Sequence, residues 1–133
     1  IKKYNSEMKV FELAAPEWVR IVEEHRIHKP QSIEQIKEVL EVMTEYKPDK
    51  IVLACTHYPY LLDVLKKFMP AEKFIDPALF FAQNIKDDLA KNGLLGDKFE
   101  YEKFFVSSDP ENFKLASELF YKLDELPQLV KIA

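Results

Sequence analysis

A cysteine and a histidine stand two residues apart, directly after a short apolar run near the middle of the chain. Residues 51–54 are Ile-Val-Leu-Ala, and Cys55 and His57 follow them. A thiolate can attack an electrophile or remove a proton, and a neighbouring imidazole can exchange protons with the thiol at neutral pH. The spacing therefore predicts acid–base or nucleophilic chemistry at Cys55, assisted by His57.

Both side chains also have a purely structural interpretation. Free cysteine is among the most buried residue types and behaves as a small hydrophobe. A histidine in a loop can bond to nearby backbone groups and do nothing more. Position alone gives the two interpretations of Cys55 equal weight, and the nearby imidazole of His57 favours the chemical one.

The elements expected around Cys55 are those of an α/β protein. Residues 51–54 suit a strand buried on both faces, as in a parallel sheet. Pro59 can occupy the first turn of a helix that carries the apolar residues Leu61, Leu62, Leu65 and Phe68. Cys55 is thus expected between the carboxyl end of a strand and a helix N-terminus, where α/β proteins bind ligands and free N–H groups favour an anion.

The rest of the chain alternates between predicted strands and helices. Strands are predicted for residues 8–14, 74–75, 99–106 and 129–132. Further helices are predicted to begin at Pro16, at a Ser32–Gln35 capping box, at Asp76-Pro77 and at residues 107–110. Gly93 is expected to end the helix that begins at Asp76-Pro77. The last helix is expected to bury Phe113, Ala116, Leu119, Phe120 and Leu123. This alternation predicts a parallel sheet with crossover helices, with the strand before Cys55 in its interior.

Glu23 and the pair His25 and His28 are further polar residues that could take part in chemistry. Glu23 closes the apolar stripe of the helix that begins at Pro16, and a solvated helix-end carboxylate is its ordinary interpretation. His25 and His28 could share a helix face, as metal ligands sometimes do. No third ligand has a recognisable spacing, so no metal site is predicted.

Composition narrows the class of protein. With 133 residues, of which 47% are hydrophobic, the chain can form one ordinary globular domain. A net charge of −4 and the lack of a dense Lys/Arg block argue against nucleic-acid binding. The apolar runs are too short to span a bilayer, and no signal peptide is visible, so no membrane partner is expected. A single cysteine excludes an internal disulfide and fits a reducing, cytoplasmic setting.

The segment at residues 54–59, Ala-Cys-Thr-His-Tyr-Pro, closely resembles the second catalytic-cysteine motif of bacterial glutamate racemases. Residues 13–23 look like the segment of that family whose final glutamate, here Glu23, lies near the active site. Residues 74–76 look like the strand end after the cysteine helix of the family, and residues 105–120 are similar to its closing strand and helix. The resemblance covers most of the chain after Lys9, and His57 separates it from aspartate racemases, which carry an acidic residue there.

The resemblance implies a Rossmann-like, three-layer lobe of a two-lobe α/β enzyme. The first lobe of the family supplies Asp-Ser-Gly and Cys-Asn-Thr segments, and neither tripeptide occurs here. The chain therefore looks like the second half, and its start at Ile1 fits a fragment. Residues 1–76 would be part of the second catalytic lobe, and residues 77–133 would return toward the missing first lobe. Ala15 and Ala54 depart from a cysteine and a glycine common in the family.

The implied reaction is inversion of glutamate at its α-carbon without a cofactor, which supplies D-glutamate for peptidoglycan. Cys55 would be one of two catalytic cysteines, His57 and Glu23 would tune it, and Thr56 would bind substrate. The implied partners are glutamate and the missing N-terminal lobe with its second cysteine. A homo-oligomer or an exchanged tail is expected to cover exposed apolar faces, and this chain alone is expected to be inactive.

Two other functions stay open from the sequence. A racemase-like lobe can keep the fold as a binding domain without catalysis. Alternatively, Cys55 can act as a covalent nucleophile with His57 as its base. First-lobe motifs in the coding sequence upstream would favour the racemase over both.

Overall fold

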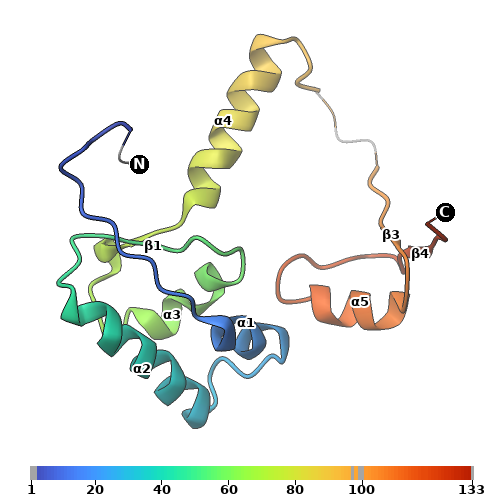
Figure 1. Ribbon diagram of the computed structural model, residues 1–133. Helices are drawn as coiled ribbons and strands as arrows, with labels where there is room; N and C mark the ends of the chain where they lie inside the picture. Colours follow the sequence, from blue (N-terminus) through green and yellow to red (C-terminus); the bar gives the residue numbers. More distant parts are fainter. Residues whose placement is uncertain (1–2, 97, 99–100, 133) are drawn as a thin grey trace. The chain divides into compact units, whose positions relative to one another are not determined.

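The computed structural model describes residues 3–96, 98 and 101–132 (Figure 1). The chain divides into two compact units, residues 1–83 and 84–133, and the boundary falls within helix α4. The helices are α1 (Pro16–Glu23), α2 (Pro30–Glu45), α3 (Leu62–Leu65), α4 (Pro77–Lys91) and α5 (Pro110–Ser117), with 3₁₀ turns η1 (Tyr58–Leu61) and η2 (Ala71–Lys73). The strands are β1 (Ile51–Val52), β2 (Phe74–Ile75), β3 (Phe105–Val106) and β4 (Gln128–Leu129).

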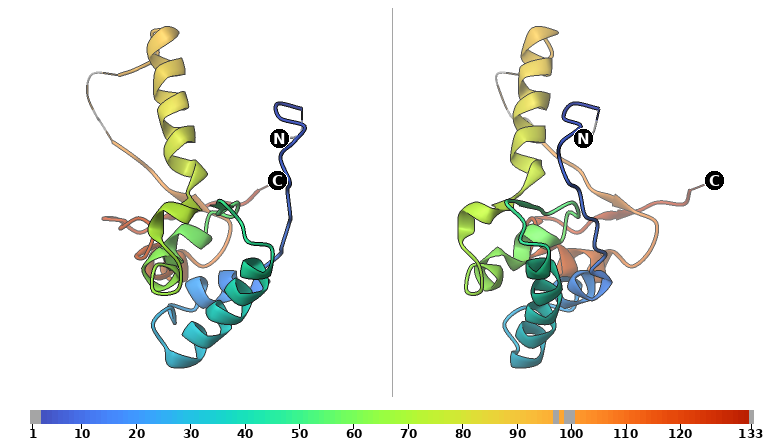
Figure 2. Two further views of the ribbon diagram at one scale, coloured as in Figure 1. Left: turned by 90° about the vertical axis from the view of Figure 1, so that its left-hand side faces the viewer. Right: turned by 60° about the vertical axis from the view of Figure 1, so that its left-hand side comes forward.

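The core of the first unit lies where α1, α2 and α3 meet near β1 (Figure 2). As predicted, a helix begins at Pro16, because proline at the first helical position loses no hydrogen bond. Each of these helices and the β1 segment contributes apolar side chains to the core. The fully buried ones are Trp18, Ile21, Val22, Ile36, Leu40, Leu53, Leu61, Val64 and Leu65. In α2, the residues Ile33, Ile36, Val39, Leu40 and Met43 recur at helical spacing, and Ile36 and Leu40 of this set are buried.

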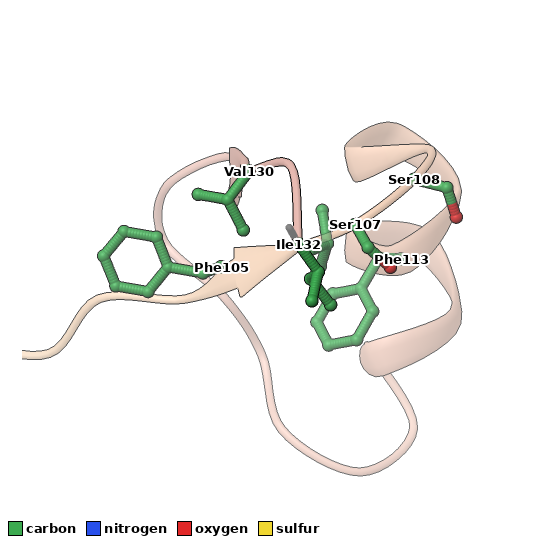
Figure 3. A pocket seen from close by; sticks show the side chains of 7 residues that line it. Phe105, Ser107, Ser108, Phe113, Val130 and Ile132 are labelled. Atoms are coloured by element: carbon green, nitrogen blue, oxygen red, sulfur yellow. The ribbon is translucent and has the colours of Figure 1, made fainter.

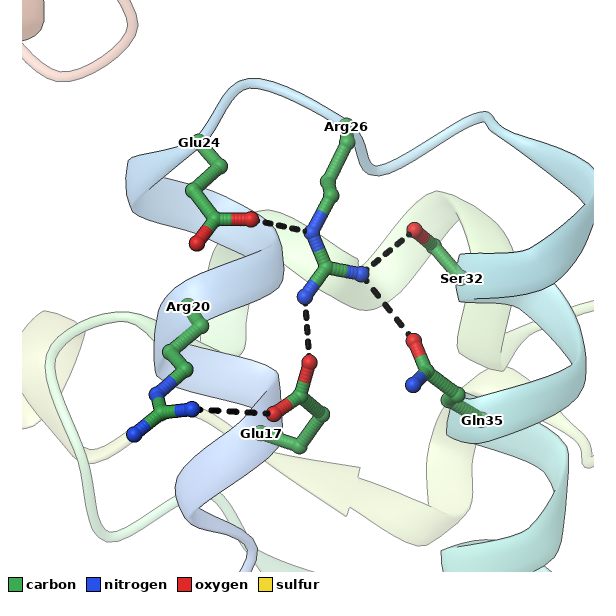
Figure 4. Close-up of polar contacts among 6 residues, drawn as sticks. All are labelled: Glu17, Arg20, Glu24, Arg26, Ser32 and Gln35. Atoms are coloured by element: carbon green, nitrogen blue, oxygen red, sulfur yellow. Dashed lines mark hydrogen bonds and ion pairs between the residues drawn. The ribbon is translucent and has the colours of Figure 1, made fainter.

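The predicted capping box at Ser32 is wrong. Helix α2 begins at Pro30, so Ser32 lies inside its first turn and is buried. Its hydroxyl instead accepts a hydrogen bond of 3.0 Å from Nη1 of Arg26, and Gln35 Oε1 accepts another of 3.0 Å from the same nitrogen (Figure 4). The guanidinium also pairs with Glu24 and Glu17, and these hydrogen bonds raise the pKa of Arg26. The Ser32 hydroxyl thus bonds to Arg26 and does not cap the helix.

The strand predicted for residues 8–14 is not formed in the described part of the chain. A strand needs a neighbour to satisfy its backbone groups, and β1 pairs with β2 instead. Phe11 of this segment is 48% exposed and stacks on the ring of Tyr46, with ring centroids 3.6 Å apart. Residues 8–14 are therefore held by the contact of the Phe11 side chain with Tyr46 and not by strand pairing.

Strands β1 and β2 are parallel, with Ile51 opposite Phe74, and the chain continues the ladder when Leu53 N–H donates to Ile75 C=O at 2.9 Å. The prediction of a strand buried on both faces is wrong, because Ile51 and Leu53 are buried whereas Val52 is 50% exposed. The predicted interior position is also not observed: β1 has one partner strand among the described residues.

Helix α4 is capped as predicted. Ala78 N–H donates to Asp76 Oδ1 at 2.9 Å, and Pro77 is its first residue. Gly93 adopts a left-handed φ of 66°, which lets Leu94 N–H reach back to Leu89 C=O at 2.8 Å. None of the described residues of α4 is buried, and its apolar side chains Leu79, Phe80, Phe81 and Ile85 are 74%, 69%, 67% and 44% exposed.

The second unit contains a parallel pair, β3 and β4, connected through α5. Asp109 caps α5 as predicted, accepting from Asn112 N–H at 3.1 Å. The strand predicted for residues 99–106 is confirmed at Phe105–Val106, while residues 99 and 100 lie outside the described residues. The edge strand predicted for residues 129–132 is observed one residue earlier, at Gln128–Leu129.

The buried face predicted for the last helix is mostly wrong. Helix α5 ends at Ser117, and no residue described in it is buried. Leu123 is buried but lies beyond the helix, whereas Phe113 and Phe120 are 43% and 39% exposed. Phe113 lines an open cavity of about 350 Å³ with Phe105, Ser107, Ser108, Val130 and Ile132 (Figure 3). This apolar surface has little covering within the second unit.

Candidate active site

Cys55 lies two residues beyond the last ladder contact of β1, as the sequence predicts, and is partly buried. The element that follows differs from the expected helix. Tyr58–Leu61 forms a 3₁₀ turn and α3 is a single α-helical turn, so Phe68 lies outside it. A single turn carries little macrodipole, and the predicted helix N-terminus beside the thiol is correspondingly weak. The nearest group with a chemical role is instead the imidazole of His57.

Cys55 and His57 are in contact. The Sγ atom of Cys55 lies 3.7 Å from Nδ1 of His57, a distance compatible with a hydrogen bond that involves sulfur. A thiol can donate to a neutral imidazole through this contact, and a protonated imidazole can donate to a thiolate. The pair can therefore carry a proton in either direction.

The other ring nitrogen of His57 faces a carboxylate. Its Nε2 atom lies 3.2 Å from Oε1 of Glu23, the last residue of α1. The Glu23 side chain is 58% exposed, so the carboxylate remains solvated as its ordinary interpretation requires, and it also holds the imidazole. A carboxylate behind an imidazole fixes the orientation of the ring. Cys55, His57 and Glu23 thus form one continuous set of side chains, called here the Cys–His–Glu set.

Thr56 is exposed beside this set. Its predicted role in binding substrate stays a prediction. Among the residues that the structure describes, no group of three potential metal-ligating side chains comes together. In the same described part, no helix has the length and apolar character needed to cross a bilayer.

Tyr58 was not among the residues predicted to contribute to the site. Its hydroxyl donates to Ala15 C=O at 3.1 Å and accepts from Ala15 N–H at 3.3 Å. Its ring meets Trp18 edge-on, with centroids 5.2 Å apart. No local signal could have revealed these contacts, because the hydroxyl binds backbone groups of a residue 43 positions away.

Comparison of the sequence with known proteins gives consistent matches. No family model matches the chain. It is 34% identical over 131 residues to glutamate racemase 2 of Caldanaerobacter subterraneus, covering 95% of this chain and 49% of the relative. It is 32% identical over 139 residues to the glutamate racemase of Trichodesmium erythraeum, covering 98% of this chain and 52% of the relative. The chain spans about half the length of these relatives.

Solved structures give the same match. The glutamate racemase of Francisella tularensis, solved with D-glutamate, superposes with a TM-score of 0.83 at 26% identity, covering 99% of this chain and 50% of the other. The Thermus thermophilus enzyme, solved with β-chloro-D-alanine, superposes with a TM-score of 0.76 at 27% identity over 88% of this chain and 46% of the other. In sequence and in fold, the chain is similar to glutamate racemases and spans about half of their length.

Proposed function

We propose that this chain is the C-terminal half of a glutamate racemase, which interconverts L- and D-glutamate, and that Cys55 is one of its two proton-transferring thiols. The observation that carries the proposal is the continuous Cys–His–Glu set at the carboxyl end of β1. Relatives named glutamate racemase, one of them solved with D-glutamate, support glutamate as the substrate.

The chemistry needs one proton-transferring group on each face of the α-carbon. A thiolate removes the α-proton from one face, and a thiol on the opposite face returns a proton, so no cofactor takes part. In this proposal Cys55 serves one face. His57 exchanges a proton with it across the 3.7 Å contact, and Glu23 stabilises the imidazolium that results. Thr56 binds the substrate from its exposed position beside Cys55.

The second thiol comes from the other half of the enzyme. The chain has one cysteine, and His57 cannot be the second base because it contacts Cys55 and serves the same face. We therefore propose that this chain alone does not racemise glutamate. Residues 1–76 form part of the second catalytic lobe in this proposal, and residues 77–133 return toward the first.

The exposed apolar side chains support the proposal that a partner lobe is missing. Phe80 and Phe81 of α4 are more than half exposed, and so is Phe105 of β3. Exposed apolar side chains of this kind mark an interface, here with the N-terminal lobe. Without that lobe, self-association or an exchanged tail covers it. The proposal further assigns the product D-glutamate to peptidoglycan synthesis and the protein to the cytoplasm, where its thiol stays reduced.

The proposal is tested by supplying the N-terminal half that the chain lacks. The chain is joined to the half of the Caldanaerobacter racemase that it does not match, and circular dichroism of a glutamate solution reports inversion. Racemisation is expected, and Cys55→Ser in the joined protein should lower its rate by about 10²–10⁴-fold. A folded joined protein without activity, beside an active parent, would contradict the proposal, as would full activity in the serine variant.

The same geometry favours one second candidate, a cysteine nucleophile. A thiol, an imidazole and a carboxylate in line also form a covalent-catalysis triad. Mass spectrometry of joined protein quenched with acid during turnover separates the two. An acyl or alkyl adduct on Cys55 would favour the nucleophile, whereas proton transfer leaves the thiol unmodified.

A further inference from the structure

Two consecutive residues, His57 and Tyr58, hold the two ends of helix α1. His57 Nε2 lies 3.2 Å from Glu23 Oε1 at the carboxyl end of the helix. At the amino end, the Tyr58 hydroxyl bonds both to the C=O and to the N–H of Ala15, at 3.1 and 3.3 Å. The loop that carries Cys55 is thus fixed to α1 at two points.

The dimensions of the helix make these two contacts interdependent. Helix α1 has eight residues, which corresponds to a length of about 12 Å. Because a hydrogen-bonded helix moves as a rigid rod over this distance, the position of Ala15 determines where the Glu23 carboxylate lies relative to His57.

The Tyr58 contact is built into a closed environment. Ala15 is 2% exposed and occupies the N-cap position, where its methyl group cannot accept a hydrogen bond. The Tyr58 hydroxyl satisfies its N–H group, which would otherwise be buried without a partner. Trp18, which is fully buried, holds the Tyr58 ring edge-on. Both the ring and the hydroxyl of Tyr58 therefore have one defined place.

We propose that Tyr58 is a positioning residue for the Cys–His–Glu set: its hydroxyl fixes the start of α1 so that Glu23 holds the His57 imidazole toward Cys55. The inference rests on the proposed function in taking this set as the proton-transferring site. The quantity that it governs is the reactivity of Cys55, which can be measured without racemisation. A role in stability alone would leave that reactivity unchanged in the folded variant.

The test is the pH profile of Cys55 alkylation by iodoacetamide in the full folded chain. Tyr58→Phe keeps the ring against Trp18 and removes only the hydroxyl. We expect its alkylation rate at pH 7 to fall about three- to tenfold, and the midpoint of its profile to move to higher pH, as in Glu23→Gln. In the variant that combines Tyr58→Phe with Glu23→Gln, the alkylation rate should be no lower than in Glu23→Gln alone, because both changes act through the same contact. Tyr46→Phe, whose ring stacks on Phe11, is the matched control and should leave the profile unchanged.

The outcomes separate this inference from the proposed function. A shifted profile in His57→Gln with an unshifted one in Tyr58→Phe would overturn the inference and leave the site intact. An unshifted profile in His57→Gln would overturn both. If Tyr58→Phe does not fold, 4-aminophenylalanine at position 58 keeps a donor for Ala15 C=O and should preserve most of the reactivity at pH 7. A folded 4-aminophenylalanine variant with the reactivity of Glu23→Gln would overturn the inference.

Discussion

His57 Nε2 lies 3.2 Å from Glu23 Oε1, although α2 and β1 separate the two residues in the chain. Because the other ring nitrogen of His57 faces Cys55, the carboxylate influences a thiol that it does not contact. A carboxylate in this position orients the imidazole and stabilises the positive charge that the ring gains when it accepts the proton of the thiol.

Native Cys55 is therefore expected to react with iodoacetamide at pH 7 faster than the same cysteine in the urea-unfolded chain. Glu23→Gln should remove most of this advantage by weakening the imidazolium. Glu45→Gln is the matched control, because Glu45 is an exposed carboxylate at the end of another helix. A thiol that reacts only after unfolding, or equal rates in the two glutamine variants, would refute this role for Glu23.

Strand β1 offers a direct test of its one-sided burial. Leu53→Ala should lower the free energy of unfolding by about 2–5 kcal/mol, because its fully enclosed side chain leaves a cavity. Val52→Ala is the control on the neighbouring residue and should change it by about 0.5 kcal/mol or less, since Val52 is half exposed. Urea denaturation followed by far-ultraviolet circular dichroism measures both. Equal losses would mean that both faces of the strand are covered in solution.

The exposed apolar side chains of α4 predict self-association of the chain. Light scattering should give a mass above that of the 15.7 kDa monomer, and the double substitution Phe80→Asp and Phe81→Asp should reduce it. Asn84→Asp adds a charge at an exposed polar position of the same helix and should leave the mass unchanged. A strictly monomeric wild-type chain in dilute solution would argue against this prediction.

Tyr121 provides a pH-dependent contact in the second unit. Its hydroxyl donates to the Glu102 carboxylate at 2.8 and 2.9 Å, and this hydrogen bond raises the pKa of Tyr121 above 10.0. Because the folded-state pKa is the raised one, the stabilisation is complete below about pH 10 and is lost as the pH rises through that pKa. The 295 nm difference titration between wild type and Tyr121→Phe should give a midpoint above 10. In the Glu102→Gln background the midpoint should fall toward 10, and an identical midpoint there would exclude the contact in solution.

Much of the fold could be predicted because the signals are local. Asp76 and Asp109 each precede a proline, and both aspartates cap the helix that follows, since the cap geometry involves only adjacent residues. Ser32 carries a similar signal, but the helix begins two residues earlier at Pro30, so Ser32 lies inside the first turn and its hydroxyl accepts from Arg26 instead. The strand predicted for residues 8–14 failed for a different reason, because strand formation depends on a neighbour that local alternation does not specify.

The candidate site divides in the same way. Cys55 and His57 are two residues apart, and their contact follows from that spacing at a strand end. The approach of Glu23 depends on the packing of α1 against the η1 turn, and only the family resemblance indicated it. The Tyr58 side chain bonds to backbone groups of Ala15, which every residue type except proline carries, so this contact could not be predicted from the residue types.

The central claim is that this chain supplies one side of a two-sided proton transfer. Its most direct test is incubation of the chain alone with L-glutamate in D₂O, with deuterium at the α-carbon followed by NMR and inversion followed by circular dichroism. We predict no inversion, and at most slow deuterium exchange that Cys55→Ser abolishes, because one thiol on a strand end reaches a single face of the substrate. Inversion by the isolated chain at a rate near that of the joined two-half protein would contradict the claim.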